Sequence, residues 1–70
     1  MERMEIKQYP SGKIVGFIEI DSNGDKTVKE FSGRILGYYR KSRNGTFDFY
    51  GRQLAFGDVT GIFFKQHFNF

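Results

Sequence analysis

The sequence Gly33-Arg34-Ile35-Leu36-Gly37-Tyr38 occurs, with small changes, three times in this chain. The other copies are Gly12-Lys13-Ile14-Val15-Gly16-Phe17 and Gly51-Arg52-Gln53-Leu54-Ala55-Phe56. Each copy contains a glycine, a cation, a variable residue, an aliphatic residue, a small residue and an aromatic residue. Such a repeat is typical of a chain built from similar units that bury their apolar surface against one another. We therefore treat residues 1–70 as one repeat domain, with repeats at 12–17, 33–38 and 51–56.

The residues that follow the first two copies predict β-hairpins. Residues 13–20 and 34–41 are rich in β-branched and aromatic side chains, which favour strands. Each run leads into an Asn-Gly pair, at Asn23-Gly24 and Asn44-Gly45, which is the strongest short-range hairpin signal. We expect the returning strands at 26–31 and 47–50.

The two ends of the chain are predicted to close the structure. After the third copy, a break at 57–61 leads to a returning strand at 62–66. Residues 67–70 alternate polar and aromatic side chains, as a half-buried strand does. We expect this segment to pair with a first strand at 4–9 and complete a fourth two-stranded unit. The predicted fold is all-β, with short antiparallel hairpins around a pseudo-four-fold axis, and no helix is predicted.

The glycines of each copy have different predicted roles. The first glycine ends a turn, and a turn is where a glycine can take a positive φ. The later small residue interrupts a strand, which usually marks a bulge or a close approach of backbone. We expect equivalent strands to converge on a common axis there, with the aliphatic and aromatic residues on the opposite face. The structural repeat positions are Gly12, Gly16, Gly33, Gly37, Gly51 and Ala55.

At these residues the chain resembles the four-fold β flower proteins, which are short bacterial repeat chains without an established function. Their repeat has the form aromatic-x-Gly-Lys/Arg-x-aliphatic-Gly-aromatic, and the resemblance covers Tyr9 to about Phe56. It implies an all-β fold of two-stranded units around a pseudo-four-fold axis. It implies no activity and no functional residues. The chain departs from the repeat at Gln53, where the other copies have Ile, and by losing the Asn-Gly turn in the third unit.

The composition limits the class of protein. The chain has 70 residues, and aromatic residues occupy 19% of its positions. Because it has no cysteine, neither disulfides nor thiolate metal sites stabilise it. A chain this short buries only about 60% of its unfolded surface, and oligomerisation would increase that fraction. We expect no signal peptide, because the N-terminal residues are charged and lack an apolar run, and no apolar run is long enough for a membrane helix. We expect a soluble, cytoplasmic protein with no membrane partner.

One stretch, residues 38–52, interleaves aromatic residues with cations across a predicted hairpin. That composition is typical of surfaces that stack nucleic-acid bases and hold phosphates. The net charge of +3 permits such a partner without requiring one. In the alternative interpretation, which we prefer, the rings belong to the core and the cations face water. The candidate surface comprises Tyr39, Arg40, Lys41, Arg43, Phe47 and Phe49.

No pattern in the sequence predicts catalysis, a cofactor or a metal. Asp21-x-Asn23-x-Asp25 has the spacing that opens a calcium loop, but Lys26 and Ser32 stand where that loop needs Gly and Glu. A hairpin turn explains the same residues. His67 is the only histidine, and nothing near it in the sequence suggests a catalytic partner. The cations Lys13, Arg34 and Arg52 are expected to line one rim and face water.

The sequence therefore predicts a small non-enzymatic binding or self-association module. In the leading hypothesis, exposed aromatic residues contact another protein or another copy of the chain, because the rings exceed what so small a core can hide. The alternative is a basic, aromatic-rich domain that binds nucleic acid through the candidate surface.

Overall fold

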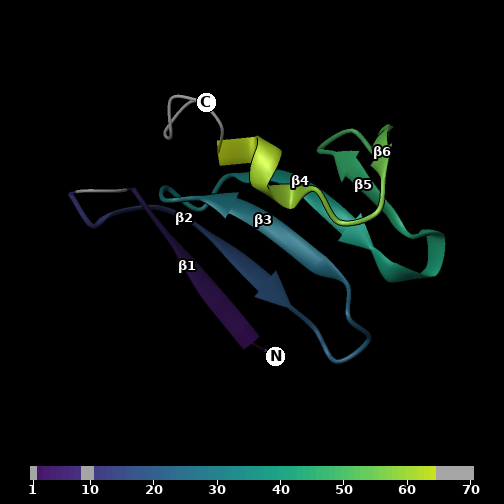
Figure 1. Ribbon diagram of the computed structural model, residues 1–70, viewed down its shortest axis with the longest axis horizontal. Helices are drawn as coiled ribbons and strands as arrows, with labels where there is room; N and C mark the ends of the chain where they lie inside the picture. Colours follow the sequence, from purple (N-terminus) through teal and green to yellow (C-terminus); the bar gives the residue numbers. More distant parts are fainter. Residues whose placement is uncertain (1, 9–10, 65–70) are drawn as a thin grey trace.

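The computed structural model describes residues 2–8 and 11–64, which form one antiparallel sheet (Figure 1). Each strand pairs with the next along the chain, in the order β1-β2-β3-β4-β5-β6. The strands are β1 (Glu2–Gln8), β2 (Lys13–Ile20), β3 (Lys26–Glu30), β4 (Ile35–Arg40), β5 (Gly45–Asp48) and β6 (Gln53–Phe56). Two 3-10 helices, η1 (Lys41–Arg43) and η2 (Thr60–Phe64), complete the described chain. The predicted all-β class is confirmed, and no helix in the described residues is long and apolar enough to cross a bilayer.

The three sequence repeats begin with similar turns. In each, the amide of the turn glycine donates to a carbonyl at the end of the preceding strand. These bonds join Gly12 to Gln8 at 2.7 Å, Gly33 to Glu30 at 2.8 Å and Gly51 to Asp48 at 3.0 Å. All three glycines have positive φ, between 75° and 96°, which an L side chain rarely adopts. Because the sheet is a meander, these three turns lie at the same end of it.

The aliphatic residue of each repeat lies in a β-bulge. In the first hairpin Ile6 pairs with Gly16 and Lys7 pairs with Ile14, so Val15 has no residue opposite it. The register shifts in the same way around Leu36 in the second hairpin and Leu54 in the third. A bulge bends its strand and increases the local twist. The repeat seen in the sequence is therefore also a repeat in backbone geometry.

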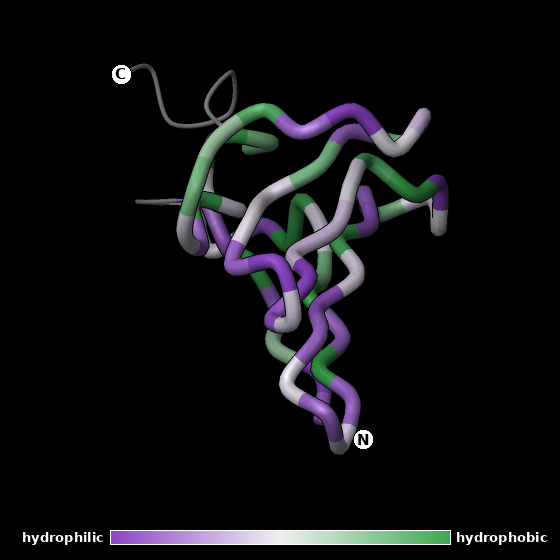
Figure 2. Tube along the Cα trace, turned by 90° about the vertical axis from the view of Figure 1, so that its right-hand side faces the viewer, coloured by the Kyte–Doolittle hydropathy of each residue, from purple (hydrophilic) through white to green (hydrophobic). Residues whose placement is uncertain are grey.

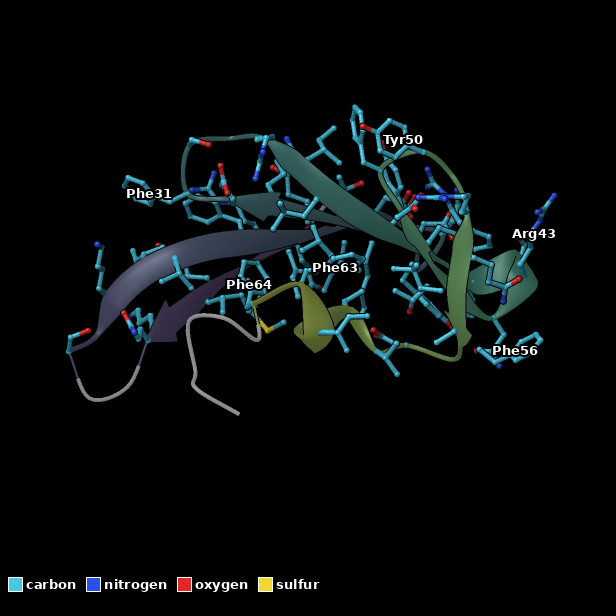
Figure 3. The ribbon with its side chains drawn as sticks, turned by 90° about the horizontal axis from the view of Figure 1, so that it is seen from above. Phe31, Arg43, Tyr50, Phe56, Phe63 and Phe64 are labelled. Atoms are coloured by element: carbon cyan, nitrogen blue, oxygen red, sulfur yellow. The ribbon has the colours of Figure 1, made fainter. Side chains whose placement is uncertain are left out.

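One face of the sheet is covered by η2, at the C-terminal end of the described chain. Figure 3 shows Phe63 and Phe64 pointing from η2 toward the sheet. Phe64 is 1% exposed and packs in a core cluster with Val15, Ile18 and Val28. The prediction of a strand at 62–66 is wrong for residues 62–64, and residues 65–66 lie outside the described chain. The segment is helical because its two rings insert against the sheet instead of adding a strand.

The small residues of the first two repeats make room for these rings. A Cβ on Gly16 would overlap the ring of Phe64, and a Cβ on Gly37 would overlap the ring of Phe63. Each added Cβ would also meet a backbone carbonyl oxygen of the neighbouring strand. In the described residues, the side chains that need this space are the rings of η2, and the expected convergence of strands on a common axis stays a prediction. The third repeat has Ala55 at this position.

Two side chains fix the segment that leads into η2. Thr46 is fully buried, and its hydroxyl donates to the carbonyl of Gly57 at 2.8 Å and accepts from the amide of Val59 at 3.0 Å. Asp58 forms an ion pair with Lys26 on β3. These contacts position η2 over the sheet.

The sheet is open rather than closed. In Figure 1, β1 and β6 form its two opposite edges, and no described strand joins them. The predicted closing segment, 67–70, lies outside the described residues, so the fourth unit and the four-fold arrangement stay predictions. Figure 2 shows that the hairpin end beside the N-terminus is largely hydrophilic.

Candidate functional site

The open face, meaning the sheet face opposite η2, carries a groove over β4 and β5. Tyr38 and Phe47 lie directly opposite each other across these strands. Arg40 follows Tyr38 by two residues and therefore lies on the same face. The groove has a volume of about 480 Å³. Its lining residues are Tyr38, Arg40, Ser42, Arg43, Phe47, Phe49, Tyr50 and Gly51.

Aromatic rings position the two arginines of the groove. The guanidinium carbon of Arg40 lies 4.7 Å from the centre of the Tyr38 ring, and one of its nitrogens lies 3.7 Å from a carboxylate oxygen of Asp25. The guanidinium carbon of Arg43 lies 6.0 Å from the centre of the Phe47 ring. Among the described residues, Arg43 forms no ion pair. Both cations therefore stand beside flat apolar surfaces, where an anion can reach them.

The β5–β6 turn supplies the exposed rings. Phe49 is 53% exposed and Tyr50 is 81% exposed, and their rings meet edge to face with centres 5.5 Å apart. Asp48 holds this turn, because its carboxylate accepts from the amides of Tyr50 and Arg52 and from the side chain of Arg52. These contacts, with the Arg52 amide first, lower the pKa of Asp48 below its ordinary value. The turn is therefore preorganised by an ionised carboxylate at neutral pH.

The charge of the groove has one sign. Two arginines line it, and none of its lining residues is acidic. Exposed rings stack on planar groups, and arginines bind phosphates or carboxylates. The groove therefore suits a ligand that combines a flat ring with a negative charge.

The structure brings four of the six predicted surface residues together. Arg40, Arg43, Phe47 and Phe49 all line the groove. Phe47 is 6% exposed and forms the buried floor, so the alternative interpretation of a core ring describes Phe47 but not Phe49.

The other two predicted residues lie elsewhere. Tyr39 alternates with Tyr38 and so faces the η2 side, where its hydroxyl donates to Asn44 at 3.1 Å. The Lys41 side chain lies against Gly24 in the neighbouring turn. The sequence list omitted Tyr38 and Tyr50, although the period of two along a strand would have placed Tyr38 with Arg40.

The acidic cluster at 21–25 stabilises a turn. Asp21 accepts from the amides of Asn23 at 2.9 Å and Asp25 at 3.1 Å. Asp25 accepts from the amide of Lys41 at 2.9 Å. These contacts are those of the hairpin turn that the sequence predicts. His67 lies outside the described residues.

The repeated cations lie at the turn end of the sheet. Arg34 is 70% exposed and pairs with Glu30 at 3.1 Å. Arg52 is 78% exposed and pairs with Asp48 at 3.0 Å. Both therefore stand largely in water beside a carboxylate of their own turn.

Comparisons with protein-family models, with curated proteins and with solved structures gave no match. The resemblance to the four-fold β flower proteins therefore rests on the repeat motif alone.

Proposed function

We propose that this chain is a non-enzymatic module that binds single-stranded nucleic acid in the groove on the open face. The observation that carries this proposal is the convergence of two arginines and two exposed rings in a groove without an acidic lining residue. Protein surfaces that bind single strands combine cations along the backbone with rings that stack on bases.

Each part of the groove has a distinct role in this proposal. A base stacks on Tyr50 or Phe49, which stand out from the turn. The flanking phosphates lie against Arg40 and Arg43. Every base has a flat face and every nucleotide has a phosphate, so such binding tolerates many sequences.

The test measures the anisotropy of a fluorescein-labelled, mixed-sequence hexadeoxynucleotide as the protein is added. The first pair of variants is Tyr50→Ser and Phe56→Ser, which remove rings of nearly equal exposure, 81% and 83%. Only Tyr50 lines the groove. Loss of one stacked base weakens binding by about 1–3 kcal/mol, so Tyr50→Ser should raise Kd at least about fivefold. Phe56→Ser should leave Kd unchanged.

The second pair tests the phosphate contacts. The groove double variant carries Arg40→Ser and Arg43→Ser, and the turn double variant carries Arg34→Ser and Arg52→Ser. Both variants lose two positive charges, but from different places on the sheet. Two phosphate contacts on a single strand give a slope of about −1.4 when the logarithm of the affinity is plotted against the logarithm of the salt concentration. The affinity should therefore fall about sevenfold between 50 and 200 mM salt. The groove double variant should lose most of this slope, and the turn double variant should keep it.

Two results would overturn the proposal. One is equal weakening by both double variants, which would mean that net charge alone attracts the oligonucleotide. The other is displacement of the labelled oligonucleotide by an inorganic polyphosphate of the same charge at the same concentration as by the unlabelled oligonucleotide, since stacking on Tyr50 would then contribute nothing.

A further inference from the structure

The turn end of the sheet contains the same groove twice. The first, of about 610 Å³, lies between the β1–β2 and β3–β4 turns, and the second, of about 380 Å³, lies between the β3–β4 and β5–β6 turns. In each, a cation-x-aliphatic segment forms one wall and the next turn forms the other. The first groove has Lys13-Ile14-Val15 facing Phe31-Ser32, and the second has Arg34-Ile35-Leu36 facing Phe49-Tyr50.

The contacts between the first and second hairpins show what this arrangement buries. The amide of Phe31 donates to the carbonyl of Val15, in the bulge, at 3.0 Å. The Phe31 ring stacks on Phe17 with ring centres 6.2 Å apart. Phe17 also lies opposite Lys29 across the β2–β3 pair. The next hairpin thus bonds to the bulge that holds the aliphatic residue and covers the aromatic residue of the hairpin before it.

The third hairpin presents the same wall with no following turn among the described residues. Leu54 occupies the position of Val15 but is 49% exposed, whereas Val15, which packs with Val28 of the next hairpin and with Phe64, is 6% exposed. Phe56 occupies the position of Phe17, and at 83% it is the most exposed large hydrophobic residue of the described chain. Both lie on β6, an edge of the sheet.

We infer that β6 of one copy pairs with β1 of a second copy, so that the chain assembles head to tail. The new contact continues the interface that already joins β2 to β3 and β4 to β5. It covers Leu54 and Phe56 with the first hairpin of the next copy. Since the two edges differ, the contact is heterologous and produces either a closed ring or a growing chain of copies.

The existing interfaces also give the register. Lys29 lies opposite Phe17 in the β2–β3 pair. It immediately precedes Glu30, whose carbonyl accepts a hydrogen bond from the turn glycine Gly33. Lys7 holds the same place before the first turn. Equivalent pairing therefore places Lys7 of one copy opposite Phe56 of the next.

The charges of the two edges fit this partner. β1 carries both signs, at Glu2, Arg3, Glu5 and Lys7, which disfavours uncontrolled pairing of β1 with itself. The sequence of β6, Gln53–Phe56, has no charged residue. Pairing of β1 with β6 therefore opposes no like charges within these strands.

Cross-linking tests the register directly, because the chain has no cysteine. Within one copy, β1 and β6 are separated by five strand spacings, or about 24 Å, which is far beyond the reach of a disulfide. Pairing that places Lys7 opposite Phe56 also places Gln8 opposite Ala55, just as Glu30 lies opposite Gly16 beside the Lys29–Phe17 pair. Gln8→Cys with Ala55→Cys, which keeps Phe56, should therefore give a ladder of disulfide-linked oligomers under mild oxidation. Met4→Cys with Ala55→Cys has the same thiols four residues out of register and should give little or none. Equal ladders from both pairs would overturn the inference.

Light scattering over a range of concentrations tests the assembly without any cross-link. The mass should rise above that of the monomer for the natural chain and for Tyr50→Ser, whereas Phe56→Ser should stay monomeric at the same concentrations. A monomeric natural chain, or an assembly that survives Phe56→Ser, would overturn the inference. The oligonucleotide assay should give the reverse pattern, in which Tyr50→Ser weakens binding and Phe56→Ser leaves it unchanged. The two proposals can therefore fail independently.

Discussion

Replacing Phe64 by Ala should remove much of the stability of this protein. Phe64 is 1% exposed and lies between η2 and the core cluster of Val15, Ile18 and Val28. Truncation of a buried phenylalanine costs about 3–5 kcal/mol. A chain of 70 residues has a free energy of unfolding of about 3.5–10 kcal/mol. Phe64→Ala should therefore remove at least about a third of this free energy, and all of it if the natural chain lies at the low end of the range.

Urea titration followed by circular dichroism and tyrosine fluorescence measures this loss. The control is Phe56→Ala, measured with the chain dilute enough to be monomeric, because Phe56 is 83% exposed there and its truncation should change stability by less than about 0.5 kcal/mol. A loss below about 1 kcal/mol for Phe64→Ala would refute the packing of η2 on the sheet. Equal losses for the two variants would refute it as well.

A double-mutant cycle then asks whether Gly16 is small because of Phe64. Gly16→Ala should destabilise the natural chain, since the added methyl overlaps the Phe64 ring and a carbonyl of β3. In the milder Phe64→Leu background part of this overlap is removed, and the cost of Gly16→Ala should fall by about 0.5–3 kcal/mol. Strictly additive costs would show that the ring is not the reason for the glycine.

Thr46→Val keeps the shape of a fully buried side chain but removes the hydroxyl that bonds the Gly57 carbonyl and the Val59 amide. Urea titration should show that the free energy of unfolding falls by about 1–3 kcal/mol. Thr46→Ser, which keeps the hydroxyl, should lose less. Asp58→Asn should cost about 0.5–1 kcal/mol at neutral pH, because it removes the ion pair with Lys26. Burial alone would raise the pKa of Asp58, but its hydrogen bonds hold the pKa below the ordinary 3.8. The natural chain should therefore exceed Asp58→Asn in stability by the full amount at pH values above 3.8, and this difference should vanish as the pH falls through the lowered pKa. A difference between the two proteins that persists in acid would contradict this account.

Local signals in the sequence predict much of the sheet. The strands at 13–20 and 26–31 and the turns at Asn23-Gly24 and Gly33 follow from turn chemistry and side-chain type, which act over a few residues. The repeat also indicates that three hairpins share one geometry. These features require no knowledge of distant contacts.

The helix η2 could not be predicted in this way. Residues 62–64 are apolar and suit a strand as well as a helix, so local preference does not decide between them. The space at Gly16 and Gly37 decides, and it lies far away in the sequence. For the same reason, the sequence did not identify the η2 rings as neighbours of those glycines.

The groove was predicted in part for a similar reason. Composition brings Arg40, Arg43 and Phe49 to attention, but only the strand register separates Tyr39 from its neighbours. The 3-10 turn of η1 then directs Lys41 toward Gly24 and away from the groove. A composition-based list includes both faces of a strand, whereas a groove uses one.

The two rings of η2 set the width of sheet that one copy can cover. Phe64 meets the glycine of the first hairpin and Phe63 meets that of the second, while the third hairpin has Ala55 in that place. If gene duplication inserted another hairpin with its glycine, the enlarged sheet would expose an empty notch unless the helix also gained a phenylalanine. The number of hairpins that carry this glycine is therefore tied to the number of rings on η2.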